Sequence, residues 1–252
     1  MKISACIITD NNPAVLKAIE SVYDSVNEII LVNTCEDFTI DLTEHDKVKL
    51  YSFDWNDSFS DARNFGIKQA TGDWILIIDS DEVMSKPIKS VSEDFTYYSF
   101  HTINKGKPTI TVRLFKNNIG IKFVNNAHET VEGMNEHNNC FVNDIVFNHT
   151  GYDSDETIKS KLERNLRILE TDYGNKLQNY YLCNTHYGLK NKSGCVEYAL
   201  LTLKDDIEDC YKISACINVI HILNINQSTN DINEIQNKIK EIENVSTAAI
   251  HF

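Results

Sequence analysis

The chain has 252 residues, of which 42% are hydrophobic and 24% charged, a composition ordinary for a globular protein of one or two domains. Its formal net charge of −13 argues against general binding to nucleic acid or to anionic membranes, because both require a basic surface. Seven scattered cysteines without a CxxC pair indicate free thiols, and no apolar stretch is long enough for a signal peptide or a membrane span. We therefore expect a cytoplasmic protein.

The first 82 residues alternate between strand and helix patterns. Apolar runs predict strands at residues 4–9, 28–33, 48–53 and 74–79, each buried on both faces. Apolar residues at helical spacing predict one helix over residues 13–26 and another over 58–72, with a serine cap at Ser58 or Ser60 and Gly72 as its stop. Strands that alternate with helices favour a parallel sheet covered by helices, in an α/β fold.

The pattern changes after Glu82. Strand-like segments at residues 96–103, 109–117, 121–126 and 141–149 are separated by turn signals such as NKGKP and NNIG. From residue 151 the patterns are helical: a helix over 153–172, a helix pair over 179–206 with its turn near residues 192–194, and an amphipathic helix over 231–245. We predict a mixed α/β domain over residues 1–150 and a helical appendage over residues 151–252.

One predicted strand ends in three carboxylates. In GDWILIIDSDE, residues 72–82, the apolar run leads directly to Asp79, Asp81 and Glu82. Ligands of open α/β sheets bind beyond the carboxyl ends of the strands, and two neighbouring carboxylates repel unless a cation such as Mg²⁺ or Mn²⁺ joins them. A solvated acidic turn is the alternative, and for a lone DxD pattern it is the more common one.

The surrounding segment, DWNDSFSDARNFGIKQATGDWILIIDSDE (residues 54–82), favours the cation site. It resembles the family-2 bacterial glycosyltransferases of the GT-A fold, in particular a subgroup in which W-x-D-x-F-x-x-A-R-N leads through a helix to a strand ending in D-x-D-E. Further matches follow in the subgroup's order: Arg113-Leu114-Phe115, His128-Glu129, His149-Thr150-Gly151-Tyr152 and Arg164-Asn165. The resemblance implies a GT-A, Rossmann-like mixed sheet with a C-terminal α-helical appendage, whose residues 180–203 are similar to a tetratricopeptide-type (TPR) helix pair.

The resemblance also implies residue roles at a donor site. Asp81 would ligate a divalent metal, Mn²⁺ or Mg²⁺, that bridges the diphosphate of a nucleotide-sugar, and His149 matches a position that supplies a further ligand. A structural histidine is the alternative for His149, as a salt bridge to the acidic loop is for Arg63. The implied donor-binding residues are Thr9, Asn11, Asn33, Arg63, Asp79 and Ser80, with Asp79 facing the ribose and Arg63 the nucleotide.

A base is needed to take the proton from an acceptor hydroxyl, and the resemblance implies Glu129 for this role, with His128 orienting it or contacting the donor sugar. A turn-forming polar pair is the alternative for these two residues. A zinc site is a weak alternative, because no compact zinc signature matches the spacing of the four candidate ligands, His128, His137, Cys140 and His149.

Two elements depart from the family pattern. Residues 33–37 read Asn-Thr-Cys-Glu-Asp where the family has D-T-G-S-x-D, and Asp10-Asn11-Asn12 stands where it has K-N-E. Asn33 still offers a donor and an acceptor to a nucleotide base, so base contact is retained but the identity of the base is left open. The departures indicate either an altered donor preference or a weakened enzyme.

The sequence thus predicts a metal-dependent inverting glycosyltransferase that moves a sugar from a nucleotide-sugar, UDP-linked, to a hydroxyl or thiol of a glycan or a peptide side chain. One alternative is a degenerate GT-A domain that acts as a binding or scaffold module through its helices. A hydrolase or nucleotidyltransferase with the same acidic strand end is a third. The appendage is expected to pack onto the catalytic domain or to mediate a homodimer. Donor sugar, acceptor and oligomeric state do not follow from the sequence.

Overall fold

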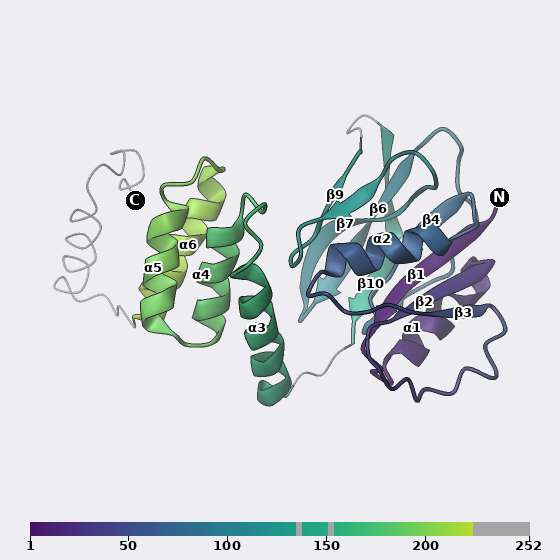
Figure 1. Ribbon diagram of the computed structural model, residues 1–252. Helices are drawn as coiled ribbons and strands as arrows, with labels where there is room; N and C mark the ends of the chain where they lie inside the picture. Colours follow the sequence, from purple (N-terminus) through teal and green to yellow (C-terminus); the bar gives the residue numbers. More distant parts are fainter. Residues whose placement is uncertain (135–137, 151–153, 224–252) are drawn as a thin grey trace. The chain divides into compact units, whose positions relative to one another are not determined.

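The computed structural model describes residues 1–134, 138–150 and 154–223 and divides into two compact units, Met1–Tyr152 and Asp153–Phe252 (Figure 1). Each unit has a hydrophobic core of its own. Among the described residues, no helix is long and apolar enough to cross a membrane.

The first unit is built around an eight-stranded mixed sheet with the order β3-β2-β1-β4-β7-β6-β10-β5. Its N-terminal half is parallel and consists of β1 (Ile3–Thr9), β2 (Glu28–Asn33), β3 (Val48–Ser52) and β4 (Trp74–Ile77). The other half, in which β7 is antiparallel to both β4 and β6, consists of β6 (Tyr97–Asn104), β7 (Lys107–Lys116), β10 (Asn139–His149) and the short β5 (Glu82–Met84). The predicted mixed α/β sheet is confirmed.

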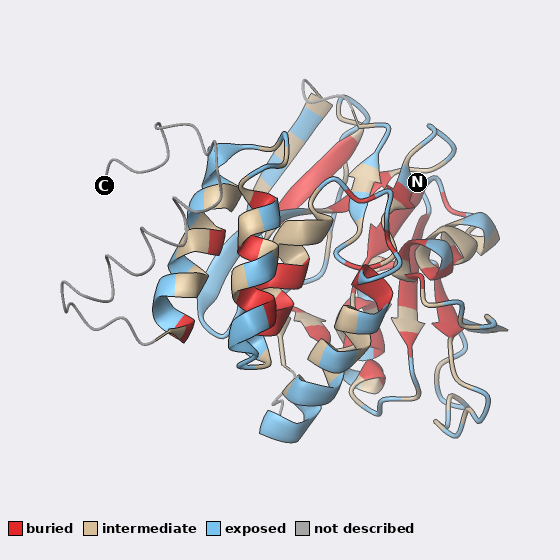
Figure 2. Ribbon diagram, turned by 60° about the vertical axis from the view of Figure 1, so that its left-hand side comes forward, coloured by how far each residue is buried: buried red, intermediate tan, exposed pale blue. Residues whose placement is uncertain are grey.

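Side chains of the central strands alternate between two cores, as the two-residue period of a strand requires. Ile3, Ala5 and Ile7 of β1 join the core that includes α1 (Val15–Val22), whereas Cys6 joins the core against which Phe65 of α2 (Phe59–Gln69) packs. The two helices therefore cover opposite faces of the sheet, and the central strands between them are almost entirely buried (Figure 2).

The structure differs from the expected elements in several details. β3 is an edge strand with an exposed Leu50 rather than a strand buried on both faces. Helix α2 begins after its Ser58 cap, as expected, but ends at Gln69, and Gly72 is instead needed because a Cβ there would lie 2.6 Å from Ser4 Oγ. The sequence did not predict β5 or β9 (Thr130–Glu132), because a strand of three residues is too short to show a period. Strand β9 pairs with β8 (Lys122–Val124).

The second unit consists, in its described part, of four helices: α3 (Asp155–Leu169), α4 (Gln178–Gly188), α5 (Lys192–Thr202) and α6 (Asp209–Ile222). Ser154 and Asn191 cap α3 and α5 by accepting backbone N–H hydrogen bonds. The predicted helix pair is present, but α5 already begins at Lys192, so the turn precedes the expected position. The predicted helix over residues 231–245 lies outside the described residues.

Candidate active site

The predicted site residues converge at one edge of the sheet. β1, β2 and β4 are parallel, so their carboxyl ends meet there, and Thr9 at the end of β1 is in register with Asn33 at the end of β2. Asp79 and Asp81 follow β4 directly. His149, the last residue of β10, is paired with Glu82 of β5, which brings the end of the unit's last strand to the same acidic turn.

Arg63 joins the acidic turn to the predicted catalytic loop. Its Nη2 donates to Asp79 Oδ1 at 2.6 Å and its Nε donates to Glu129 Oε1 at 2.5 Å. The arginine side chain is 12% exposed and that of Glu129 15%, so this ion pair is largely desolvated, whereas Asp79 is 36% exposed. The salt bridge that the sequence offered as the alternative for Arg63 is present, and contact with a nucleotide stays a prediction.

A second arginine approaches the same turn from β7. Arg113 is buried, its Nη2 donates to Glu82 Oε1 at 2.5 Å, and its Nη1 lies 3.6 Å from Asp79 Oδ2. Asp79 is therefore held between two guanidinium groups. Arg113 and Glu82 match the family pattern, but their roles did not follow from it, because neither pattern nor spacing showed that β7 would insert beside β4.

The two arginines give the neighbouring carboxyl groups opposite pKa shifts. Burial acts against ionisation of Asp79, but Arg63 and then Arg113 hold its pKa below the usual range. Burial, and then the Asp79 carboxylate, raise the pKa of Glu82 to about 7, although Arg113 opposes the shift. Asp79 is thus the group in this cluster that stays ionised. Glu82 is buried and accepts a hydrogen bond from the Asp79 backbone N–H, so it helps to hold the acidic turn in place.

The predicted metal ligands Asp81 and His149 are adjacent. His149 Nε2 lies 3.0 Å from Asp81 Oδ2, and the Asp81 carbonyl accepts a hydrogen bond from the Thr150 backbone N–H at 2.8 Å. Among the described residues no group of three or more histidine, cysteine or acidic side chains is arranged to hold a metal. One carboxylate and one imidazole fit a divalent ion that takes its remaining ligands from water and phosphate oxygens. The zinc alternative finds no support there, and its His137 lies outside the described residues.

The loop that carries His128 and Glu129 is fixed to α2. Asn64 Nδ2 donates to the Phe123 carbonyl at 2.8 Å, and the Phe123 N–H donates back to Asn64 Oδ1 at 2.9 Å. The Phe59 N–H donates to the Asn126 carbonyl, and His128 has a left-handed backbone with a φ of 53°. Such φ values are uncommon for residues other than glycine and occur where the surroundings impose them, as at functional loops.

The aromatic part of the motif forms a local unit before α2. The Trp55 indole N–H donates to Asp57 Oδ1 at 2.9 Å, and its ring meets the ring of Phe59 edge-on at a centroid distance of 4.9 Å. Asp57 has a φ of 59°, which turns the chain into the Ser58 cap. The W-x-D-x-F spacing is therefore explained by a turn that positions α2, and with it Arg63.

The remaining donor-binding candidates differ in how their polar groups are hydrogen-bonded. Asn33 is buried and uses its amide locally, donating to the Cys35 carbonyl at 2.7 Å and accepting from the Cys35 N–H at 3.2 Å. Asn11 likewise bonds to the loop of residues 37–39. Thr9 Oγ1 is buried without a hydrogen-bond partner in the described part of the chain, and Ser80 is half-buried. Their contact with a donor stays a prediction.

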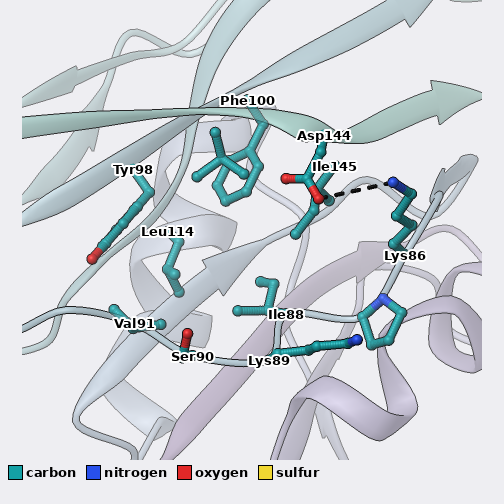
Figure 3. A pocket seen from close by; sticks show the side chains of 12 residues that line it. Lys86, Ile88, Lys89, Ser90, Val91, Tyr98, Phe100, Leu114, Asp144 and Ile145 are labelled. Carbon is teal, nitrogen blue, oxygen red and sulfur yellow. Dashed lines mark ion pairs between the residues drawn. The ribbon is translucent and has the colours of Figure 1, made fainter.

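A separate cavity of about 590 Å³ is lined on one side by the segment 86–91 (Figure 3). It is lined by Tyr98, Phe100 and Leu114, whose side chains belong to the core on the α1 face of the sheet. Two further lining residues form an ion pair, in which Lys86 Nζ lies 3.8 Å from Asp144 Oδ2. None of the predicted site residues lines this cavity, so it is distinct from the cluster around Arg63.

Comparison with known proteins relates the first part of the chain to a family. Residues 4–107 match the model of glycosyl transferase family 2. This segment of the chain is therefore similar to glycosyltransferase family 2. The glycosyltransferase SunS of Bacillus subtilis is 31% identical over 185 residues, which are 65% of this chain and 43% of SunS. A TPR repeat-containing protein of Synechococcus elongatus is 29% identical over 228 residues, which are 82% of this chain and 57% of that protein.

The chain thus spans about half the length of the curated relatives that it matches. Among solved structures, Staphylococcus aureus TarS aligns with a TM-score of 0.48 and 12% identity over 88% of this chain and 55% of its own. The mixed sheet with C-terminal helices has the architecture that the family resemblance implied. Arg113, Glu129 and His149 lie beyond the segment that matches the family model, so their roles depend on the geometry of the site.

Proposed function

We propose that this chain is a metal-dependent glycosyltransferase that moves a sugar from a UDP-linked donor to an acceptor hydroxyl or thiol with inversion at the anomeric carbon. The observation that carries the proposal is the cluster at the carboxyl ends of the strands, where Arg63 links Asp79 to Glu129 and His149 meets Asp81. The largely buried Arg63 there connects the acidic turn, which we propose faces the donor, to the carboxylate that we propose faces the acceptor.

Asp81 and His149 would hold the divalent cation, Mn²⁺ or Mg²⁺. The ion would neutralise negative charge on the departing nucleoside diphosphate, which is the usual contribution of such a metal to this chemistry. Arg63 and Arg113 keep Asp79 ionised and oriented, so that its carboxylate can accept hydrogen bonds from the ribose hydroxyls.

Glu129 would act as the base. Its Oε1 is held by Arg63, whereas Oε2 accepts no hydrogen bond from the described residues and is available to the acceptor. The carboxylate is thus oriented through one oxygen and takes the acceptor's proton on the other. The acceptor itself is a hydroxyl or thiol of a glycan or a peptide side chain in this proposal.

The test is a transfer assay with UDP-hexoses and UDP-N-acetylhexosamines, Mn²⁺, and hydroxyl- and thiol-containing glycan and peptide acceptors. The wild-type chain is expected to release UDP only when metal is present. Glu129→Gln is expected to bind UDP with unchanged affinity and to lose about 100-fold or more in rate, the usual contribution of a positioned base. Normal transfer by this variant would remove Glu129 from the mechanism.

One observation favours a second candidate, a GT-A domain retained as a binding module. The Asn33 amide, which stands where the family has a base-reading aspartate, is already satisfied by Cys35. A module of this kind would bind no nucleotide, so failure to bind UDP, GDP or dTDP under any metal condition would favour it over the enzyme.

A further inference from the structure

Strand β7 is longer than the strand that flanks it on one side. It pairs with β6 along most of its length, from Lys107 to Phe115. On its other side, β4 pairs only with Leu114–Lys116, and the described residues provide no other strand there. The four residues Thr109–Val112, which we call the β7 edge, are therefore paired on one side only. All of them except the half-buried Val112 are exposed.

The turn before β7 determines which backbone groups of the β7 edge point outward. Lys105 and Gly106 have φ values of 48° and 76° and connect β6 directly to β7, as in a two-residue hairpin with a type I′ turn. The pair that flanks such a turn, Asn104 and Lys107, is hydrogen-bonded, and hydrogen-bonded and non-hydrogen-bonded pairs alternate from there. The even-numbered residues of β7 up to Val112, after which the register shifts, therefore direct their backbone N–H and C=O groups away from β6.

Ile110 and Val112 thus present backbone N–H and C=O groups along the free side of β7. Within the described part of the chain, no backbone hydrogen bond joins either residue to a turn or loop. The two residues are roughly 7 Å apart, which is the repeat of a strand. Pro108, which also points outward, has no N–H and closes the end near the turn. The β7 edge itself contains neither a proline nor a charge, the devices that usually protect such an edge from pairing.

The β7 edge ends at the proposed active site. Arg113 follows it directly, and its Nη1 lies 3.6 Å from Asp79 Oδ2. Asp79 accepts a hydrogen bond from Arg63, which also donates to Glu129, the proposed base. A chain that paired with the β7 edge would therefore run along it to the cluster that contains Glu129.

We propose that the acceptor is an extended peptide, which adds to the sheet as a strand along the β7 edge and directs a serine, threonine or cysteine side chain to Glu129. This acceptor class rests on the proposed function of the site. N–H and C=O groups at the repeat of a strand match the backbone of an extended peptide, whereas the hydroxyls of a glycan have no such repeat. Because the main chain makes the pairing, peptides of different sequence can bind.

Amide exchange tests the binding without requiring transfer. The probe is a pool of capped peptides of about six residues, enough to span the β7 edge, with a central serine or cysteine and all other positions randomised. In the full chain alone, NMR should show slow exchange for Thr109 and Thr111, which bond to β6, and fast exchange for Ile110 and Val112. At saturation the pool should slow the exchange of Ile110 and Val112 about tenfold or more, whereas the same pool methylated on every backbone nitrogen should not.

A proline substitution tests the same pairing from the side of the protein. Ile110→Pro removes one outward N–H and none of the bonds to β6, and proline is tolerated at such an edge position. The KM of the peptide acceptors is expected to rise about threefold to tenfold, while the KM of the UDP-sugar stays unchanged. Ile110→Thr keeps the N–H and a β-branched side chain, and it is the control.

Unchanged exchange of Ile110 and Val112 with the pool would overturn the proposal, as would transfer to peptides that Ile110→Pro does not weaken. Slow exchange of these two amides in the free chain that is lost on dilution would also overturn it, because it would assign the β7 edge to a second copy. Protection by the pool without any transfer would instead uphold the peptide site and contradict the proposed function.

Discussion

Replacing Arg63 by methionine is expected to destabilise the first unit by about 3 kcal/mol. Removing one partner of a buried ion pair costs about 3–5 kcal/mol, because the remaining charge is left without a counterion. The lower end applies here, since Asp79 keeps Arg113 at 3.6 Å while Glu129 loses its Nε contact at 2.5 Å. For a unit of this size the loss corresponds to a fall in Tm of roughly 6–12 °C.

Glu129→Gln completes a double-mutant cycle, because glutamine keeps the shape of the side chain and removes its charge. Glu129 is 15% exposed and Arg63 12%, so we expect the two substitutions together to cost about 1–3 kcal/mol less than the sum of their separate effects. The control is Lys122→Met with Glu132→Gln, an exposed pair at 3.3 Å whose coupling should stay below about 1 kcal/mol.

The assay is urea unfolding followed by tryptophan fluorescence. Both tryptophans, Trp55 and Trp74, belong to the first unit, so the signal reports on that unit alone. The midpoint and the slope are fitted for each variant, and an unchanged slope shows that the difference is one of stability. A coupling energy between Arg63 and Glu129 no larger than that of the control pair would refute the connection between the acidic turn and the loop that carries Glu129.

Three further predictions concern other residues. Burial opposes ionisation of Glu28, but hydrogen bonds from Lys49, Ser4 and Thr71 lower its pKa to about 2 from the usual 4.5. The ionised carboxylate should therefore contribute roughly 3 kcal/mol to the free energy of unfolding above pH 4.5, and this contribution should be lost as the pH falls towards 2. In Glu28→Gln, the free energy of unfolding should accordingly depend less on pH in this range. Gly72→Ala should destabilise the first unit by about 1–3 kcal/mol, because its Cβ would lie 2.6 Å from Ser4 Oγ and 2.8 Å from Ser4 N, whereas Gly174→Ala, with open space around it, should not destabilise its unit in calorimetry. Asp81→Asn should weaken Mn²⁺-dependent UDP binding about tenfold or more in calorimetric titrations, and Asp144→Asn, beside the separate cavity, should leave it unchanged; equal losses in both variants would contradict a metal role for Asp81.

The sheet was predictable because its strands are apolar runs bounded by turn signals. EIILVN coincides with β2 to the residue, and the alternation of strands and helices fixed the parallel half. The antiparallel half was predictable as strands but not in its order, because the insertion of β7 between β4 and β6 depends on contacts far apart in the sequence. The sequence likewise did not show that β3 would be an edge strand, because Leu50 fits an apolar pattern and is nevertheless exposed.

The sequence could name the candidate positions of the site, but not the hydrogen bonds that join them. The family resemblance named Arg63, Asp79 and Glu129 individually, and their mutual hydrogen bonds appear only when α2, the end of β4 and the loop after β8 are brought together. Arg113 and Glu82 illustrate the remaining gap. Their ion pair joins β5 to β7, two strands that are not neighbours in the sheet, so no local sequence signal could indicate it.

The central claim, a nucleotide-sugar site at the strand ends, is tested most directly by thermal unfolding of the first unit with UDP, GDP and dTDP, each with and without Mn²⁺. Trp55, which lies in the turn before α2, reports the transition by fluorescence. A nucleotide at about 100 times its Kd adds roughly 2.7 kcal/mol to the free energy of unfolding, a rise in Tm of several degrees. The account predicts such a rise for UDP that requires Mn²⁺ and is absent in Asp81→Asn. An unchanged Tm with all three nucleotides would contradict it.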